Sequence, residues 1–142
     1  MDNMLSVRDM NVFQTMFGPE SPFLALATFT STSATDFTVN GTAAAKPGLG
    51  LRWYITDIIF QAGTTFRTNA EGQFITLSTA TGTFFQQPLV GATASTTPIN
   101  NCLHYKFRKP LAVLGYNEKL TGQLSGYNAG SLYVTILGYT GG

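Results

Sequence analysis

The chain has 142 residues, the size of one domain, and a formal net charge of only +1. Charged residues make up 11% of it, well below the usual level of about 25%, so charge gives no reason to bind nucleic acid or an anionic membrane. Hydrophobic residues at 44% and aromatic residues at 13% exclude bulk disorder. The polar residues are mainly Thr, Ser, Gly, Asn and Gln, which is typical of a β protein with a nearly neutral surface.

Residues 1–22 differ from the rest because they hold all four methionines of the chain. Four apolar residues fall there at helical spacing, namely Met10, Phe13, Met16 and Phe17. Asp9 is suited to cap such a helix, and Gly18 and Pro19 would end it. We predict a short amphipathic helix or an extended arm over residues 1–22. It either packs on its own domain or docks on a neighbouring subunit, for which flexible thioether side chains are well suited.

The start of the chain has no apolar core of a signal peptide, and no apolar run approaches the length of a membrane span. The single cysteine, Cys102, excludes an internal disulfide. We therefore expect a protein that is made and folded in a cytoplasm.

From residue 23 onward the chain consists of short strand-like runs separated by turn signals. The strongest signals are Asn40-Gly41 and the tripeptide at residues 80–82. The predicted strands are residues 23–29, 36–39, 51–62, 73–79, 83–89, 102–107, 111–114, 118–124 and 132–139. This spacing predicts an all-β domain over residues 23–142, a jelly-roll-like antiparallel β-sandwich of about eight short strands.

The run at residues 51–62 is apolar on both faces toward its end, which is typical of a central strand or of one covered by a partner. Simple alternation puts Asp57 on the same face as Trp53. A buried carboxylate must be hydrogen-bonded, so we expect Asp57 to accept bonds from turn amides, Arg52 or Lys106.

No residue pattern points to catalysis. Cys102 and His104 share one face of a strand, but no second Cys or His completes a zinc site, and Asp57 would contribute a ligand only if the fold brought it close. The carboxylates show no pairing of the kind that glycosidases use, and no phosphate loop or nucleophile elbow is present. We expect no enzyme activity, no metal and no cofactor.

Two surface features admit more than one interpretation. Tyrosines near turns or the end of the chain would cap the sandwich, stack on sugars or anchor an interface; they are Tyr116, Tyr127 and Tyr139. The densest basic cluster would be a solvated strand end or a contact with an acidic protein surface; it is Lys106, Arg108 and Lys109.

Three segments carry a resemblance to a known group of proteins. Residues 53–60 read Trp-Tyr-Ile-Thr-Asp-Ile-Ile-Phe, residues 107–111 read Phe-Arg-Lys-Pro-Leu, and residues 133–139 read Tyr-Val-Thr-Ile-Leu-Gly-Tyr. In this order they resemble the strand patterns of small virion proteins of tailed bacteriophages, with residues 73–79 matching a further strand loosely. The likeness covers residues 51–142 and is one of pattern.

The resemblance implies a jelly-roll virion protein of the capsid decoration or cement type. Such a protein would bind the major capsid protein on the capsid surface, as a homotrimer, and would be made in the host cytoplasm. Its capsid or subunit contacts would include Met10, Phe13, Met16, Phe17, Tyr116 and Tyr127, although residues 1–22 have no counterpart in the pattern.

Other functions remain open at this point. A receptor- or carbohydrate-binding jelly-roll module of a phage head or tail fibre would need a groove lined by aromatic and polar side chains. A jelly-roll major capsid subunit is disfavoured because the chain is short and has no basic arm. A non-viral β-sandwich binding module is the remaining alternative.

Overall fold

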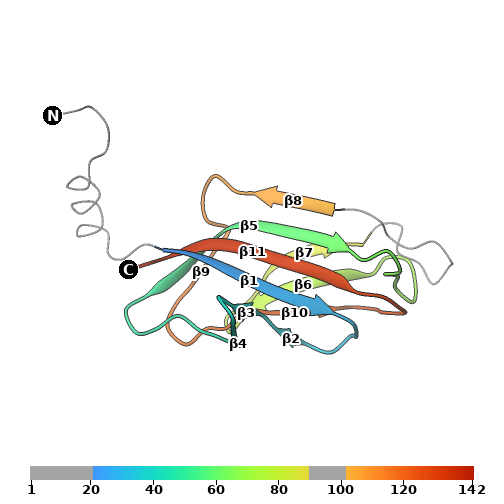
Figure 1. Cartoon of the computed structure of the whole chain (residues 1–142), viewed down its shortest axis with the longest axis horizontal. Coiled ribbons are helices and arrows are strands. Elements are labelled where there is room, and N and C mark those ends of the chain that lie inside the picture. Colours follow the sequence, from blue (N-terminus) through green and yellow to red (C-terminus); the bar gives the residue numbers. More distant parts are fainter. Residues whose placement is uncertain (1–20, 90–101) are drawn as a thin grey trace.

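The computed structural model describes residues 21–89 and 102–142, and within these ranges all regular structure is β-strand. The strands form two antiparallel sheets that pack into a sandwich (Figure 1). The prediction of an all-β antiparallel sandwich is confirmed. The predicted helix or arm at residues 1–22 lies almost wholly outside the described residues.

The larger sheet has seven strands and the smaller sheet has four. The larger sheet has the order β4-β3-β1-β11-β5-β8, with β9 also paired to β5; its strands are β1 (Ser21–Phe29), β3 (Thr38–Val39), β4 (Thr42–Ala43), β5 (Arg52–Ala62), β8 (Cys102–Lys106), β9 (Ala112–Leu114) and β11 (Leu132–Gly141). The smaller sheet has the order β2-β10-β6-β7; its strands are β2 (Thr35–Asp36), β6 (Phe74–Thr79), β7 (Gly82–Pro88) and β10 (Thr121–Leu124). The predicted hairpin of residues 73–89 is present as β6 and β7.

Strand β1 shows why the sequence folds this way. Its residues alternate, so Phe23, Ala25, Ala27 and Phe29 point into the sandwich and are buried. The residues between them point outward, and Leu24 and Leu26 are 41% and 48% exposed. Strand β1 pairs along its whole length with β11, which fixes this alternation in register.

An aromatic cluster in the core joins the two sheets. Phe60 of β5 lies 5.9 Å from the ring of Phe85 on β7 and 6.2 Å from the ring of Tyr105 on β8. The Tyr105 hydroxyl donates a hydrogen bond of 2.6 Å to Gln87 Oε1, which gives the buried amide a partner. This cluster holds the edge strand β8 against the smaller sheet.

The prediction of one strand at residues 36–39 is wrong. The structure divides it between the sheets, because β2 belongs to the smaller sheet and β3 to the larger one. The chain crosses at Phe37, whose buried ring packs 6.0 Å from Phe29 in the core. The predicted turn follows at once, with φ values of 49° at Asn40 and 84° at Gly41. The predicted strand at residues 118–124 is likewise shorter, because only residues 121–124 pair.

A β-bulge in β5 overturns the predicted placement of Asp57. The register with β11 shifts between Leu137, which faces Asp57, and Gly138, which faces Ile55, so Thr56 is an extra residue on β5. The buried side chains are Trp53 and Ile55 before the bulge and Ile58 and Phe60 after it. Asp57 therefore lies on the outer face of the sheet and not on the Trp53 side.

Gly138 is required where the bulge brings two strands together. A Cβ atom at this position would collide with the carbonyl oxygen of Tyr54 and lie 2.6 Å from the ring of Phe23. We expect Gly138→Ala to lower the free energy of unfolding by about 1–3 kcal/mol, because the backbone of β5 has to move. Urea denaturation measures the change. Gly48→Ala is the control, since its Cβ would meet only Leu51 at an ordinary 3.6 Å, and equal losses in the two variants would contradict the explanation.

Candidate functional site

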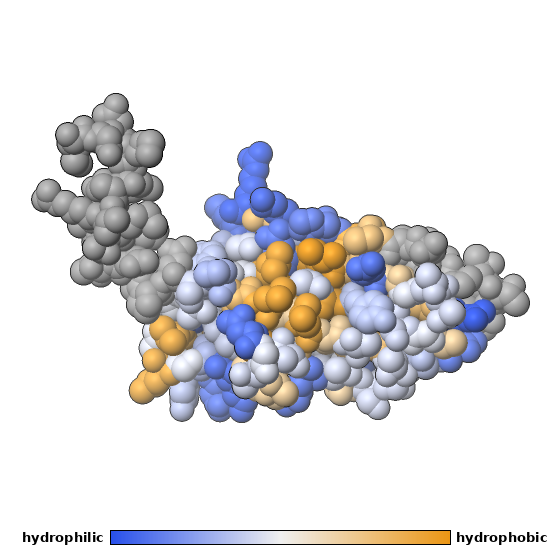
Figure 2. Space-filling model, viewed as in Figure 1, coloured by the Kyte–Doolittle hydropathy of each residue, from blue (hydrophilic) through white to orange (hydrophobic). Residues whose placement is uncertain are grey.

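The outer face of the larger sheet carries a cluster of apolar side chains. We call it the outer apolar face; its residues are Leu24, Leu26, Ile59, Tyr133 and Leu137. Strand register brings them together, because Leu24 pairs with Leu137 and Leu26 lies in one row with Thr135 and Ile59. Figure 2 shows hydrophobic side chains gathered over β1, β11 and β5. Tyr133 is 46% exposed, similar to the two leucines of β1, so this face is open to solvent in the isolated chain.

Aromatic residues extend this face toward the start of β1. Tyr54 of β5 and Tyr139 of β11 stack with ring centroids 4.8 Å apart and an interplanar angle of 14°. Val113 on β9 pairs with Tyr54 and is exposed, while Pro22 of β1 pairs with Tyr139. Apolar surface therefore continues along the sheet beyond Leu24.

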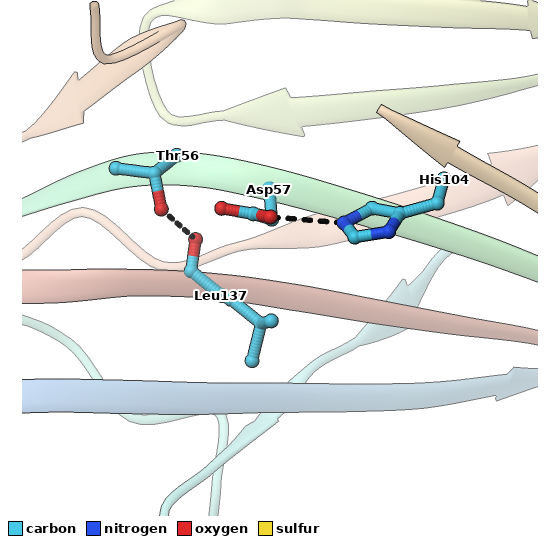
Figure 3. Close-up of polar contacts among 4 residues, drawn as sticks. All are labelled: Thr56, Asp57, His104 and Leu137. Atoms are coloured by element: carbon cyan, nitrogen blue, oxygen red, sulfur yellow. Dashed lines mark hydrogen bonds and ion pairs between the residues drawn. The ribbon is translucent and has the colours of Figure 1, made fainter. Parts of the chain in front are cut away.

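A hydrogen-bonded pair of Asp57 and His104 borders the outer apolar face on the side of the edge strand β8. Nε2 of His104 lies 2.9 Å from Oδ2 of Asp57 (Figure 3). The Asp57 side chain is only 14% exposed, whereas the His104 side chain is 51% exposed. Beside them, the Thr56 hydroxyl donates a hydrogen bond of 3.4 Å to the carbonyl oxygen of Leu137. Asp57 accepts a hydrogen bond as predicted, but it comes from His104 rather than from a turn amide, Arg52 or Lys106.

The surroundings of Asp57 favour its charged form. Partial burial by itself would raise the pKa of this carboxyl, but hydrogen bonds from His104 and Thr56, together with the charges of His104 and Lys106, hold its pKa below the usual value. Lys106 faces Asp57 across the pairing of β5 and β8. The pair thus places a compensated negative charge next to an apolar surface.

Asp57→Asn should reduce stability at neutral pH but not in strong acid. A depressed folded-state pKa adds stability above the unfolded value near 3.8, and this stability is lost as pH falls through the folded-state pKa. Since His104 is half exposed and solvent screens the pair, we expect a loss of about 0.5–1 kcal/mol at pH 7 that shrinks from about pH 4 downward. Urea titrations across this range measure it. In a His104→Gln background the same substitution should cost less, and a loss that is independent of both pH and His104 would refute the assignment.

Positive charges flank the outer apolar face. Arg52 at the start of β5 and Lys106 at the end of β8 are both exposed, and Arg108 and Lys109 follow in the exposed connection after β8. The basic cluster predicted from the sequence is therefore at a strand end. Asp57 is the acidic residue on this side, and it already contacts His104.

The outer face of the smaller sheet has the opposite character. A polar groove of about 400 Å³ lies there, lined by Thr32, Phe74, Thr76, Ser78, Thr83, Gln123, Leu124 and Ser125. Gln123 donates a 2.9 Å hydrogen bond to the carbonyl oxygen of Thr32, and Ser125 donates one of 2.6 Å to Gln73. This groove is thus lined mainly by hydroxyl and amide groups, in contrast to the outer apolar face, while a second hollow at the end of the smaller sheet includes Phe74, Pro88 and Leu89.

The remaining predicted site residues are dispersed. Tyr116 is 62% exposed in the connection after β9, whereas Tyr127 packs against the core and donates a 2.7 Å hydrogen bond to the carbonyl oxygen of Gly130. Cys102 and His104 do share the outer face of β8, as predicted. The four apolar residues predicted to make contacts in the arm lie outside the described residues; they are Met10, Phe13, Met16 and Phe17. The contact role of all six residues stays a prediction.

The outer apolar face was not identified from the sequence. A signal was present, since the predicted strand at residues 23–29 has leucines on the face opposite its phenylalanines. In residues 21–89 and 102–142, no three His, Cys, Asp or Glu side chains gather in a way that could hold a metal ion. Within the same ranges, no helix is long and apolar enough to cross a membrane.

Comparisons with protein families, curated proteins and solved structures find no match to this chain. The function must therefore be argued from the two faces of the sandwich.

Proposed function

We propose that this protein is a structural subunit of a larger protein assembly, and that the assembly is the head of a tailed bacteriophage, which the protein decorates and stabilises. The observation that carries the proposal is the outer apolar face. A surface that exposes Leu24, Leu26 and Tyr133 together is typical of a protein contact, because soluble monomers rarely leave large contiguous apolar patches in water.

The strand order supports the jelly-roll part of the proposal. Eight strands remain when β3 and β4 at one edge of the larger sheet and β9, which lies off its main strand order, are set aside, and these eight can be numbered one to eight along the chain. The larger sheet then reads one-eight-three-six and the smaller reads two-seven-four-five. Two Greek keys wound together produce this interleaving, and jelly rolls are common in capsid proteins.

The contrast between the two faces fits a subunit that is covered on one side. In a trimer, the apolar sheet would be buried between copies while the polar sheet stays in water. Three copies bound together at neighbouring capsid subunits gain avidity from weak single contacts. Binding only to the assembled shell would then stabilise the shell by mass action.

The test is co-sedimentation of the purified, tagged chain with phage heads that lack it. We expect saturable binding at a fixed ratio to the major capsid protein and a raised melting temperature of the heads. Leu24→Lys/Leu26→Lys should weaken this binding, whereas Gln86→Lys/Gln123→Lys on the smaller sheet should not. Absence of binding at every salt concentration would overturn the decoration role.

The polar groove on the smaller sheet favours a second candidate function, binding of a carbohydrate receptor. Hydroxyl and amide groups beside the Phe74 ring are the side chains that contact sugars, and Thr76 and Gln123 line the groove. A glycan array distinguishes the two functions. A ligand whose binding is lost in Phe74→Ala and unaffected by Leu24→Lys/Leu26→Lys would favour this candidate.

A further inference from the structure

The side chains of the outer apolar face and its borders determine which kind of surface can bind there. The centre of this face is apolar. Among the described residues, the exposed cations at its borders are Arg52, Lys106, Arg108 and Lys109, and of these Lys106 faces Asp57 across the pairing of β5 and β8. The carboxylate of Asp57 is 2.9 Å from His104 and is therefore engaged. A complementary occupant is apolar and carries an excess of acidic groups.

The first 20 residues of the chain have this composition. Their acidic residues Asp2, Asp9 and Glu20 outnumber the single basic residue, Arg8. The large apolar residues among them are Met1, Met4, Leu5, Val7, Met10, Val12, Phe13, Met16 and Phe17. A segment of this kind complements both the apolar centre and the cationic border.

The segment is long enough to cover the face. It joins β1 at Ser21, and Pro22 lies on the outer side opposite Tyr139, next to the row of Leu24 and Leu137. As a helix, residues 5–17 would extend about 20 Å, at about 1.5 Å per residue. The outer apolar face runs along β1 from the row of Leu24 to the row of Thr28 and Tyr133, which is about 14 Å at about 3.4 Å per residue, so a helix of this length covers it.

The sequence at the junction favours contact of the segment with another molecule over contact with its own sheet. Gly18 and Ser21 each precede a proline, and residues before proline favour extended backbone. An extended junction would continue the direction of β1 away from its own sheet. Covering its own face would require the chain to reverse within these few residues.

We propose that the outer apolar face binds residues 1–20 of a neighbouring copy of this chain. This inference shares with the proposed function the premise that the outer apolar face is an assembly surface. It does not depend on binding to a capsid. Each copy would give its segment to one neighbour and receive a segment from another. Such a contact is heterologous, and it forms a closed ring when the rotation between copies closes.

Cysteine cross-linking in the full-length chain tests the exchange. All forms carry Cys102→Ser, since Cys102 is exposed and would compete. One tagged form carries Leu26→Cys and a differently tagged form carries Phe13→Cys or, as a second position, Met16→Cys. After mixing and mild oxidation, we expect a covalent dimer that contains both tags. With Thr76→Cys on the smaller sheet in place of Leu26→Cys, the yield should fall at least tenfold.

A form that carries both cysteines in one chain distinguishes binding of the chain's own segment from binding of a neighbour's segment. Exchange between copies gives covalent multimers at micromolar concentration, whereas docking on the same chain gives a cross-linked monomer. The proposal is overturned if only that monomer forms, or if neither segment position reacts with Leu26→Cys above the level of Thr76→Cys. Because purified protein is used, failure to bind phage heads leaves this result unaffected.

Discussion

Phe60→Ala is expected to lower the free energy of unfolding by about 3–5 kcal/mol, a large part of the stability of an ordinary domain. Phe60 is 3% exposed, lies on the central strand β5, and packs against Phe85 and Tyr105 of the two strands that meet there. Its removal leaves a cavity between the sheets and loosens β8, which carries His104. Urea denaturation followed by tryptophan fluorescence measures the loss.

Two matched variants check the cause of this loss. Phe60→Leu keeps most of the volume, so it should cost clearly less than Phe60→Ala. Tyr133→Ala removes an aromatic ring from the outer apolar face, where 46% exposure in the isolated chain limits the loss to about 1 kcal/mol. If Tyr133→Ala destabilised the monomer as strongly as Phe60→Ala, the division into core and outer face would be wrong.

Leu24→Lys/Leu26→Lys is expected to abolish self-association while leaving the fold intact. Full burial of an exposed leucine side chain contributes about 1.5–3 kcal/mol, and because less than half of each side chain is still exposed, loss of the two apolar contacts alone should weaken association about 10–100-fold. Two ammonium groups in the apolar centre of the contact would also have to lose their hydration on association. Since both leucines are 41–48% exposed in the isolated chain, the unfolding midpoint of the monomer should change little.

Light scattering over a range of concentrations measures this effect. The wild-type chain should form a discrete oligomer, and the double variant should remain a monomer. Gln86→Lys/Gln123→Lys adds the same charge to the outer face of the smaller sheet and should associate like wild type. Equal association of both double variants would exclude the outer apolar face as the contact.

Most of the strands were predictable because strict alternation of apolar residues is a local signal. In β1, four buried side chains occur at every second position from Phe23, and the turn at Asn40-Gly41 needs residues that tolerate positive φ. The sequence-based predictions were wrong where tertiary structure interrupts the two-residue alternation of buried and exposed side chains. The bulge at Thr56 depends on the pairing of β5 with β11, which no local pattern reveals.

The candidate site could be predicted only in part for the same reason. The shared face of Cys102 and His104 follows from their spacing. The contact between His104 and Asp57 does not, because it depends on the bulge and on the pairing of two strands 47 residues apart. The outer apolar face likewise combines residues of β1, β5 and β11. These strands are far apart in the sequence and lie side by side only because of the strand order in the sheet.

The most direct test of the central claim is to measure which face of the sandwich becomes covered on assembly. In the Cys102→Ser background, Leu26→Cys and Thr76→Cys report on the larger and the smaller sheet, and maleimide labelling rates are compared between diluted and associated protein. We expect labelling of Leu26→Cys to slow at least tenfold on association while that of Thr76→Cys stays constant. An unchanged rate at Leu26→Cys, or protection confined to Thr76→Cys, would contradict the assignment of the outer apolar face as the assembly surface.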